Sequence, residues 1–247
     1  MDLPRMQLFE FNDLASVPAA VRDTVVESLS RMLAWGGVLG GLVEPLDEFL
    51  TVAGTREVLD IGAGAGGPAK IMVEEFRKRG RVPPRFLLTD LHPRVQAWSA
   101  LRDHHPGAID FAPDSVDATR VPETFARGRV RTIVNVLHHF PPAVARAIVL
   151  DAARNGRGVF IAEGFERNPL SYVSMWPAGI PALLLNPVLS PRDRLAKALL
   201  TYATPAAAAI ALWDGVVSTL RVYNERELRE MVAPLGDAFR WRYGLFK

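Results

Sequence analysis

The chain of 247 residues contains no cysteine. It therefore forms no disulfide, no cysteine-ligated zinc or iron–sulfur site, and no cysteine nucleophile. This excludes radical chemistry at a cysteine-bound cluster and pyrimidine methylation through a thiolate. The first residues, including Asp2, Glu10 and Asp13, lack the basic and continuous apolar regions of a signal peptide. We expect a cytoplasmic protein.

Lysine is also scarce, because only four of the 29 basic residues are lysines, and the formal net charge is +2. A basic run lies where we expect a helix to end, and positive charge suits that end of the helix dipole; it comprises Arg77, Lys78, Arg79, Arg81 and Arg85. No basic, aromatic-rich tract is present. We therefore expect no nucleic-acid partner.

Uninterrupted apolar runs are short. The run from Tyr172 to Leu189 contains Pro177, Pro181 and Pro187, and the run from Ala203 to Trp213 has only 11 residues. A spanning helix needs about 20 apolar residues and tolerates proline poorly. We expect no transmembrane segment.

The most informative stretch is Val58–Gly67, which reads VLDIGAGAGG and combines an apolar strand, an acid and a glycine-rich turn that opens a helix. Glycines accept backbone angles closed to other residues and let a ligand approach the main chain. The stretch therefore predicts a site for a nucleotide-like cofactor.

The glycine spacing fits two cofactors. Gly62, Gly64 and Gly67 satisfy the dinucleotide pattern GxGxxG, whereas Gly62, Gly64 and Gly66 satisfy GxGxG. Asp60 separates the two, because a carboxylate is a poor neighbour for a pyrophosphate but a good one for an ammonium or a sulfonium. This favours S-adenosylmethionine over a nicotinamide cofactor.

Three later segments follow in order: Arg85–Asp90, Ser115–Ala118 and Arg131–Phe140. With the glycine turn, they make residues 55–165 resemble the class I S-adenosylmethionine-dependent methyltransferases. The resemblance implies ribose binding at Asp90, adenine contact at Asp117, and a place beside the methionine part for the segment that contains Asn135. It implies cofactor contact, without a particular role, at Leu91, Ala118 and Val136. It also implies that the cofactor contacts Asp60, Gly62, Ala63, Gly64 and Gly66.

Each of these residues has a structural alternative. Asp90 and Asp117 are also what a solvated loop or a helix cap would carry. The pair His138 and His139 fits a turn before Pro141 as well as a proton-transfer role. The other pair, His104 and His105, lies in a polar loop and is interpreted as a surface feature.

Apolar strands alternate with helices that are predicted to begin after Gly67, Pro93 and Pro141. Gly158–Glu163 is predicted to be a fifth strand. The pattern predicts an α/β protein with a Rossmann-like, doubly wound, mostly parallel sheet and helices on both faces. Ligands of such sheets bind at the carboxyl ends of the strands, where Asp60, Asp90, Asn135 and Glu163 are expected.

The predicted organisation is an N-terminal helical cap (1–54), a cofactor-binding α/β core (55–167), an apolar helical insertion after the fifth strand (168–222) and a C-terminal segment (223–247). For the insertion, three interpretations stay open: a lid over an apolar substrate, a homodimer interface, or a surface that contacts a bilayer. In the C-terminal segment, Glu225–Val232 is predicted to be a helix. Ala238–Phe246 is predicted to be a final strand, which would make a sheet of six strands.

Methyl transfer from a sulfonium needs alignment, exclusion of water and, for a hydroxyl acceptor, removal of a proton. His138 or His139 is the first candidate for the base and Asp214 the second; for an amine or a thiol, positioning suffices. Trp213, Arg221 and Tyr223 are candidates for substrate contact. Alternatively, Asp214 caps a helix and pairs with Arg221.

Asn135 is not followed by the Pro-Pro-aromatic sequence of methyltransferases that act on DNA bases. We therefore expect a small, fairly apolar acceptor, methylated on oxygen or nitrogen, and no metal. A nicotinamide-dependent reductase and a non-catalytic cofactor-binding or regulatory protein remain as alternatives.

Overall fold

The computed structural model describes residues 3–14, 16–190 and 192–246. The chain divides into two compact units. One, here called the helical unit, consists of Met1–Val38 and Phe165–Tyr223. The other, the sheet unit, consists of Leu39–Gly164 and Asn224–Lys247.

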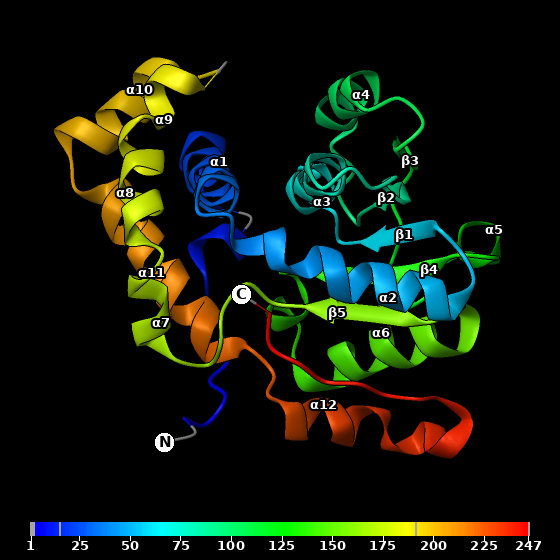
Figure 1. The fold of residues 1–247 in the computed structure, drawn as a ribbon. Helices are drawn as coiled ribbons and strands as arrows, with labels where there is room; N and C mark the ends of the chain where they lie inside the picture. The colour runs from blue at the N-terminus through cyan, green and yellow to red at the C-terminus, as the bar shows by residue number, and fades with distance from the viewer. Residues whose placement is uncertain (1–2, 15, 191, 247) are drawn as a thin grey trace. The chain divides into compact units, whose positions relative to one another are not determined.

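The sheet unit contains five parallel strands in the order β3-β2-β1-β4-β5 (Figure 1). They are β1 (Glu57–Ile61), β2 (Arg85–Thr89), β3 (Ile109–Phe111), β4 (Val130–Val134) and β5 (Val159–Ala162). All five residues of β4 are buried, as a central strand covered on both faces requires. The predicted α/β, doubly wound architecture is confirmed.

Strand order reverses between β1 and β4. The chain passes outward from β1 to β2 and β3, then returns to the other side of β1 with β4 and β5. In such sheets the crevice at the carboxyl ends of the two strands that flank the reversal is the usual ligand site. The glycine turn at residues 62–66 follows β1 at this point.

Helices of the sheet unit cover both faces of the sheet, with α3 and α4 on one side and α6 and α12 on the other (Figure 1). Proline stands in the first turn of α3 and of α6, where its missing N–H costs no hydrogen bond. A capping box between Asn224 and Glu227 begins α12. The helical elements are η2 (Val38–Leu42), α2 (Val43–Ala53), α3 (Gly67–Lys78), α4 (Val95–His104), α5 (Glu123–Ala126), η3 (Leu137–His139), α6 (Pro142–Asn155), α12 (Glu225–Val232) and η5 (Ala233–Ala238).

The predicted final strand at Ala238–Phe246 is wrong. Up to Phe246 this segment pairs with no strand, and the sheet has five strands rather than six. Its alternation of aromatic and polar residues is typical of a strand, but a strand also needs a partner edge for its backbone hydrogen bonds. Here the segment is attached by side chains, since the Arg242 guanidinium lies 2.8 Å from a Glu48 carboxylate oxygen.

The interpretation of His105 as a surface residue is also wrong, whereas His104 is exposed. His105 Nδ1 lies 2.9 Å from an Arg77 guanidinium nitrogen, and Glu74 lies 3.8 Å from the other ring nitrogen. Burial, followed by the charge of Arg77, lowers the pKa of His105. The residue therefore joins the ends of α3 and α4 instead of facing solvent.

The helical unit joins the N-terminal helix to the insertion after β5, two segments far apart in sequence. Its elements are η1 (Phe11–Asp13), α1 (Ala19–Trp35), α7 (Pro169–Val173), α8 (Trp176–Leu184), α9 (Asn186–Leu189), α10 (Arg194–Ala198), a π-helical turn η4 (Leu199–Ala203) and α11 (Ala206–Arg221). Two glycines permit close packing: a Cβ on Gly215 would lie 2.1 Å from the Tyr172 ring, and one on Gly179 would lie 3.0 Å from Met32 Sδ.

Within the described residues, no single helix combines the length and hydropathy that a membrane span requires. Taken as a pair, Arg194–Ala203 and Ala206–Arg221 meet those requirements, but they are bent by 83° at the break between them.

A buried ion pair in the sheet unit generates a stability prediction. Arg131 of β4 is fully buried and pairs with Asp151 of α6, while its Nε and Nη2 atoms have no hydrogen-bond partner in the part of the chain that the structure describes. Asp151→Ala should lower the free energy of unfolding by about 3 kcal/mol, because it leaves a buried guanidinium uncompensated. Adding Arg131→Met to this variant should recover most of the lost free energy of unfolding, as measured by urea unfolding. Equal losses in the single and double variants would contradict this account.

Candidate functional site

The glycine turn after β1 depends on left-handed backbone at three positions. Gly62, Gly64 and Gly66 have φ values of 66°, 53° and 80°. A Cβ on Gly62 would lie 2.7 Å from a methyl of Val136, and one on Gly66 would lie 2.5 Å from a methyl of Leu101. Apart from Gly64 itself and its two neighbours in the chain, no atom of the described residues would lie within 4 Å of a Cβ on Gly64. The turn therefore needs glycine for conformation at all three positions and for space at two of them.

Two side chains hold the middle of this turn. Gly64 N–H donates to Asp90 Oδ2 over 2.8 Å, and Trp98 Nε1 donates to the Gly64 carbonyl over 2.9 Å. The other Asp90 oxygen accepts from the His92 N–H, also at 2.8 Å. Asp90, predicted from the motif order, thus contacts the glycine turn directly. Trp98 was not predicted, because no local pattern places a residue of α4 against Gly64.

Asp60 points into the protein beneath the turn. Its side chain is only 3 % exposed, and its Oδ1 accepts from the Thr132 hydroxyl over 2.7 Å. Burial raises the pKa of Asp60 to about 7; the bond from Thr132 opposes this shift and the nearby charge of Asp90 adds to it. Two carboxylates close enough to influence each other give this edge of the sheet a preference for a cationic ligand.

The loop after β3 lies next to Asp90. The Val116 N–H donates to the Asp90 backbone carbonyl over 2.9 Å. Asp117 is exposed, and its Oδ1 accepts from both the N–H and the hydroxyl of Thr119, which lowers the pKa of Asp117. Leu91, the next residue after Asp90, is 54 % exposed, and its carbonyl accepts from the Ser115 hydroxyl. The segment Ser115–Ala118 therefore borders the end of β2.

Asn135, directly after β4, has a φ of 56°, a left-handed conformation that is uncommon outside glycine. Its Oδ1 accepts from the Gly164 N–H over 2.5 Å, and its own N–H donates to the Ala162 carbonyl over 2.9 Å. Its Nδ2 atom is buried and has no partner among the described residues. Strained backbone and an unsatisfied donor are typical of functional positions. The next residue, Val136, contacts Gly62 as described above.

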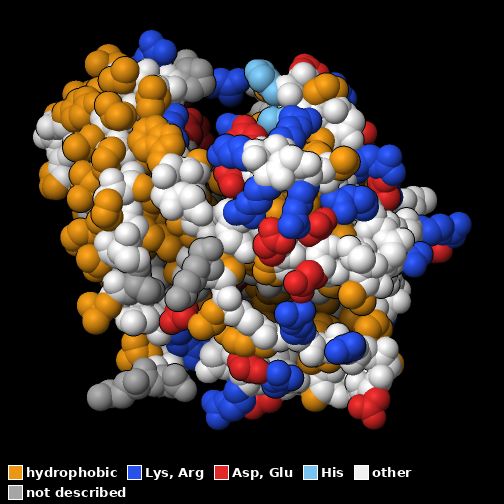
Figure 2. Space-filling view, in the orientation of Figure 1, with side chains coloured by type: hydrophobic (Ala, Val, Ile, Leu, Met, Phe, Trp, Pro, Cys, Tyr) orange, Lys and Arg blue, Asp and Glu red, His pale blue; other side chains and the backbone are white. Residues whose placement is uncertain are grey.

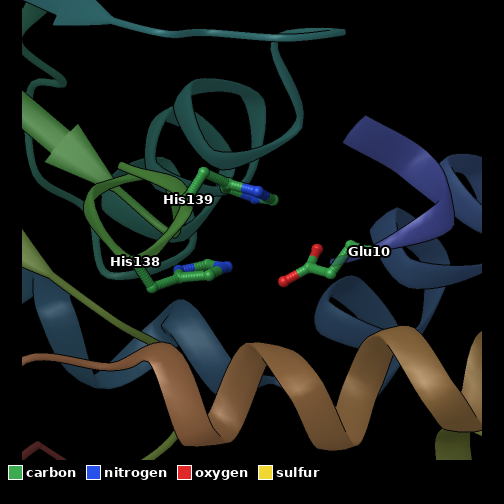
Figure 3. A group of neighbouring side chains, drawn as sticks. All are labelled: Glu10, His138 and His139. Carbon is green, nitrogen blue, oxygen red and sulfur yellow. The ribbon is translucent and has the colours of Figure 1, made fainter. Parts of the chain in front are cut away.

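His138 and His139 follow in the turn η3, and their rings stack with centroids 4.2 Å apart (Figure 3). Glu163, which follows β5, contacts His138 twice: its Oε2 lies 2.8 Å from Nδ1, and its Oε1 accepts from the His138 N–H over 3.1 Å. A carboxylate at Nδ1 favours the tautomer in which Nδ1 carries the proton and Nε2 acts as a proton acceptor. Glu163 was expected at the site but its pairing with His138 was not, because 25 residues separate them in sequence.

Asp214, the second candidate for the base, belongs to α11 in the helical unit. Its carboxylate accepts from the N–H groups of Phe11 and Asn12, over 2.8 and 3.1 Å, at the start of η1. Burial raises the pKa of Asp214 to about 6; these two bonds oppose the shift, and Glu10 and Asp13 add to it. The carboxylate therefore caps a helical turn, one of the two roles considered from the sequence.

The three candidates for substrate contact also make interactions inside the helical unit. Arg221 pairs with Glu10 at 2.9 Å and with Asp13 at 2.7 Å, rather than with Asp214 as the structural alternative proposed. The Trp213 indole donates to the Phe9 carbonyl over 3.0 Å, and the Arg5 guanidinium lies 4.1 Å from the Tyr223 ring centre. These contacts hold the N-terminal segment to α11 and to Tyr223, which follows it.

No model of a known protein family matches the chain, and no curated protein matches it at a significant level.

The raised pKa of Asp60 predicts how stability depends on pH. Between about pH 4 and pH 7 the unfolded chain has released the Asp60 proton while the folded chain retains it. The free energy of unfolding therefore falls as pH rises through this window, by an amount on the order of 4 kcal/mol.

Asp60→Asn should remove this loss, so that the variant is more stable than the wild type at pH 8 but not at pH 4. Urea unfolding at both pH values measures the difference, with the exposed Asp114→Asn as control. If the free energy of unfolding depended on pH in the same way in the wild type and in Asp60→Asn, burial would not raise the pKa of Asp60.

Proposed function

We propose that this protein is an S-adenosylmethionine-dependent methyltransferase that acts on a small, fairly apolar molecule. The observation that carries the proposal is the bond from the Gly64 N–H to Asp90, next to the buried Asp60. It joins a glycine turn and two carboxylates where the strand order reverses. The match in motif order supports the same conclusion.

The residues present fit this cofactor. Each Asp90 oxygen accepts one backbone N–H and has a second lone pair for a ribose hydroxyl. Asp117, beside it, would meet the adenine amino group. The buried Nδ2 of Asn135 is a donor suited to the carboxylate of the methionine part. The left-handed glycines leave the backbone of the turn accessible to the cofactor.

Asp60 weighs against a nicotinamide dinucleotide. A pyrophosphate at this turn would lie near Asp60, and the ionised form of Asp60 would repel it. A cofactor with an ammonium and a sulfonium group is attracted by the same carboxylate. Asp90 fits either cofactor, because dinucleotide sites also bind a ribose hydroxyl with an acid about 20 residues after the glycine turn. When bound, S-adenosylmethionine supplies a methyl carbon on sulfur that an in-line nucleophile can take.

Glu163 and His138 would provide proton removal from a hydroxyl acceptor. Nε2 of His138 would accept the proton of the acceptor hydroxyl while the hydroxyl oxygen attacks the methyl group that the bound cofactor supplies. Glu163 holds the ring by Nδ1 and stabilises the charge that His138 gains. A base oriented in this way favours oxygen over nitrogen as the acceptor atom, since an amine acceptor needs only positioning.

The cofactor assignment predicts binding that depends on Asp90. Calorimetric titration should give micromolar affinity for S-adenosylmethionine and S-adenosylhomocysteine. Asp90→Ala should weaken both by about 100-fold, because it removes the ribose acceptors and frees the Gly64 N–H. The exposed Asp114→Asn should bind like the wild type. Binding of NAD(H) or NADP(H) in place of the sulfur cofactors would contradict the assignment.

The proton-transfer assignment predicts a graded loss of kcat with a hydroxyl acceptor. His138→Gln should lower kcat by about 100-fold or more, and Glu163→Gln by roughly tenfold, with little change in the KM for the cofactor. The double variant should be no slower than His138→Gln alone, because both residues act through one proton. The exposed His104→Gln is the matched control. A His138→Gln enzyme with wild-type kcat would remove His138 from the mechanism.

A further inference from the structure

The helical unit carries an outer surface with very few polar side chains. Residues 176–189, which form α8 and α9, include no charged residue. Their only polar side chain, Asn186, is fully buried and accepts a hydrogen bond from Arg31 of α1. Trp176, Ile180 and Leu184 recur at intervals of four and are 39, 53 and 47 % exposed. An exposed helix normally has charged or polar residues on its outer face. The exposed side chains of α8 named here are apolar instead.

A second apolar stripe follows on α10 and η4. Leu195, Leu199 and Tyr202 are 75, 54 and 57 % exposed. Figure 2 shows hydrophobic side chains gathered over these helices. The combined surface, here called the apolar surface, consists of Trp176, Ile180, Leu184, Leu185, Val188, Leu189, Leu195, Leu199 and Tyr202, all exposed. A contiguous apolar area of this kind indicates an interaction site.

The exposed charges next to the apolar surface are mainly positive. Arg192 lies between α9 and α10, Arg194 is the first residue of α10, and both are exposed. From residue 168 to residue 213, Asp193 is the only acidic residue. Lys197, by contrast, is fully buried and pairs with Glu27 at 2.9 Å, so its charge is compensated inside the unit. The two arginines complement anionic groups, and a hydrocarbon surface beside them complements acyl chains.

Two exposed aromatic side chains of the helical unit, Tyr202 and Trp213, have their polar groups hydrogen-bonded within the unit. The Tyr202 hydroxyl donates to the Leu184 carbonyl over 2.5 Å, although the side chain is largely exposed. Trp213, on α11, satisfies its indole N–H within the unit and still exposes 39 % of its surface. These rings can leave water without losing a hydrogen bond, and aromatic residues are enriched where membranes meet water.

We propose that the apolar surface binds to the face of a lipid bilayer that contains anionic lipids. The short helices lie in the interface with their hydrocarbon side chains among the acyl chains, and Arg192 and Arg194 contact lipid phosphates. Among the described residues, no single helix has the length and hydropathy of a membrane span, which agrees with binding at the face of a bilayer. This proposal goes beyond the proposed function and does not depend on it.

Flotation of the full chain with vesicles tests this proposal. Vesicles of phosphatidylcholine with about one third phosphatidylglycerol should carry the protein, and vesicles of phosphatidylcholine alone should bind it more weakly. Val188→Asn with Leu195→Asn should weaken binding by roughly tenfold or more, because two side chains lose their transfer into hydrocarbon. Arg192→Gln with Arg194→Gln should remove the preference for phosphatidylglycerol.

The matched control is Val52→Asn with Val82→Asn, which changes two apolar residues of the sheet unit that are 86 and 76 % exposed, compared with 61 and 75 % for Val188 and Leu195. This control should bind like the wild type. Circular dichroism of each variant establishes that it is folded. Absence of vesicle binding by the wild type, or binding that survives Val188→Asn with Leu195→Asn, would overturn the proposal. So would a dimer in sedimentation velocity that this double variant dissociates, without any vesicle binding, because the surface would then bind a second copy.

Discussion

The buried carboxylate of Asp60 is the constraint on which the site depends. A strand in the middle of a parallel sheet has no water to solvate an acid, and the single hydroxyl of Thr132 offsets only part of the cost of burial. A buried carboxylate lowers the stability of the fold, and carboxylates with strongly raised pKa values are concentrated at functional sites, where they do what an apolar residue cannot. Beside a glycine turn and a second carboxylate, the contribution that we propose for Asp60 is attraction for a positively charged ligand.

The rest of the sheet unit brings these groups to one edge. Parallel strands end on the same side, so residues that follow β1, β2, β4 and β5 converge although the sequence separates them widely. Trp98 and Asp90 then hold Gly64 from two directions. The proposed cofactor site and the proposed proton acceptor, His138 with Glu163, therefore belong to one rigid framework. The helical unit contributes a separate feature, an outer surface of hydrocarbon.

Most of the order of strands and helices in the sheet unit could be predicted, because β1, β2, β4 and β5 are short, largely apolar runs and the helices α3, α4 and α6 begin close to a glycine or a proline. Contacts between residues that are far apart in the sequence could not be predicted. Nothing near Trp98 or Glu163 in the sequence shows which backbone carbonyl or imidazole each will reach. The prediction of a strand in the C-terminal segment was wrong for a related reason. Alternating residues such as Phe239 and Trp241 favour a strand, but they do not show whether another strand lies alongside to pair with it.

The sign of proton exchange on cofactor binding tests the central claim most directly. At pH 6 Asp60 is largely protonated in the folded protein, and a cationic ligand favours its ionised form. Titration with S-adenosylmethionine in buffers of different ionisation enthalpy should therefore show a proton released on binding, and the release should disappear in Asp60→Asn. Proton uptake, or a binding heat independent of the buffer, would contradict the role assigned to Asp60.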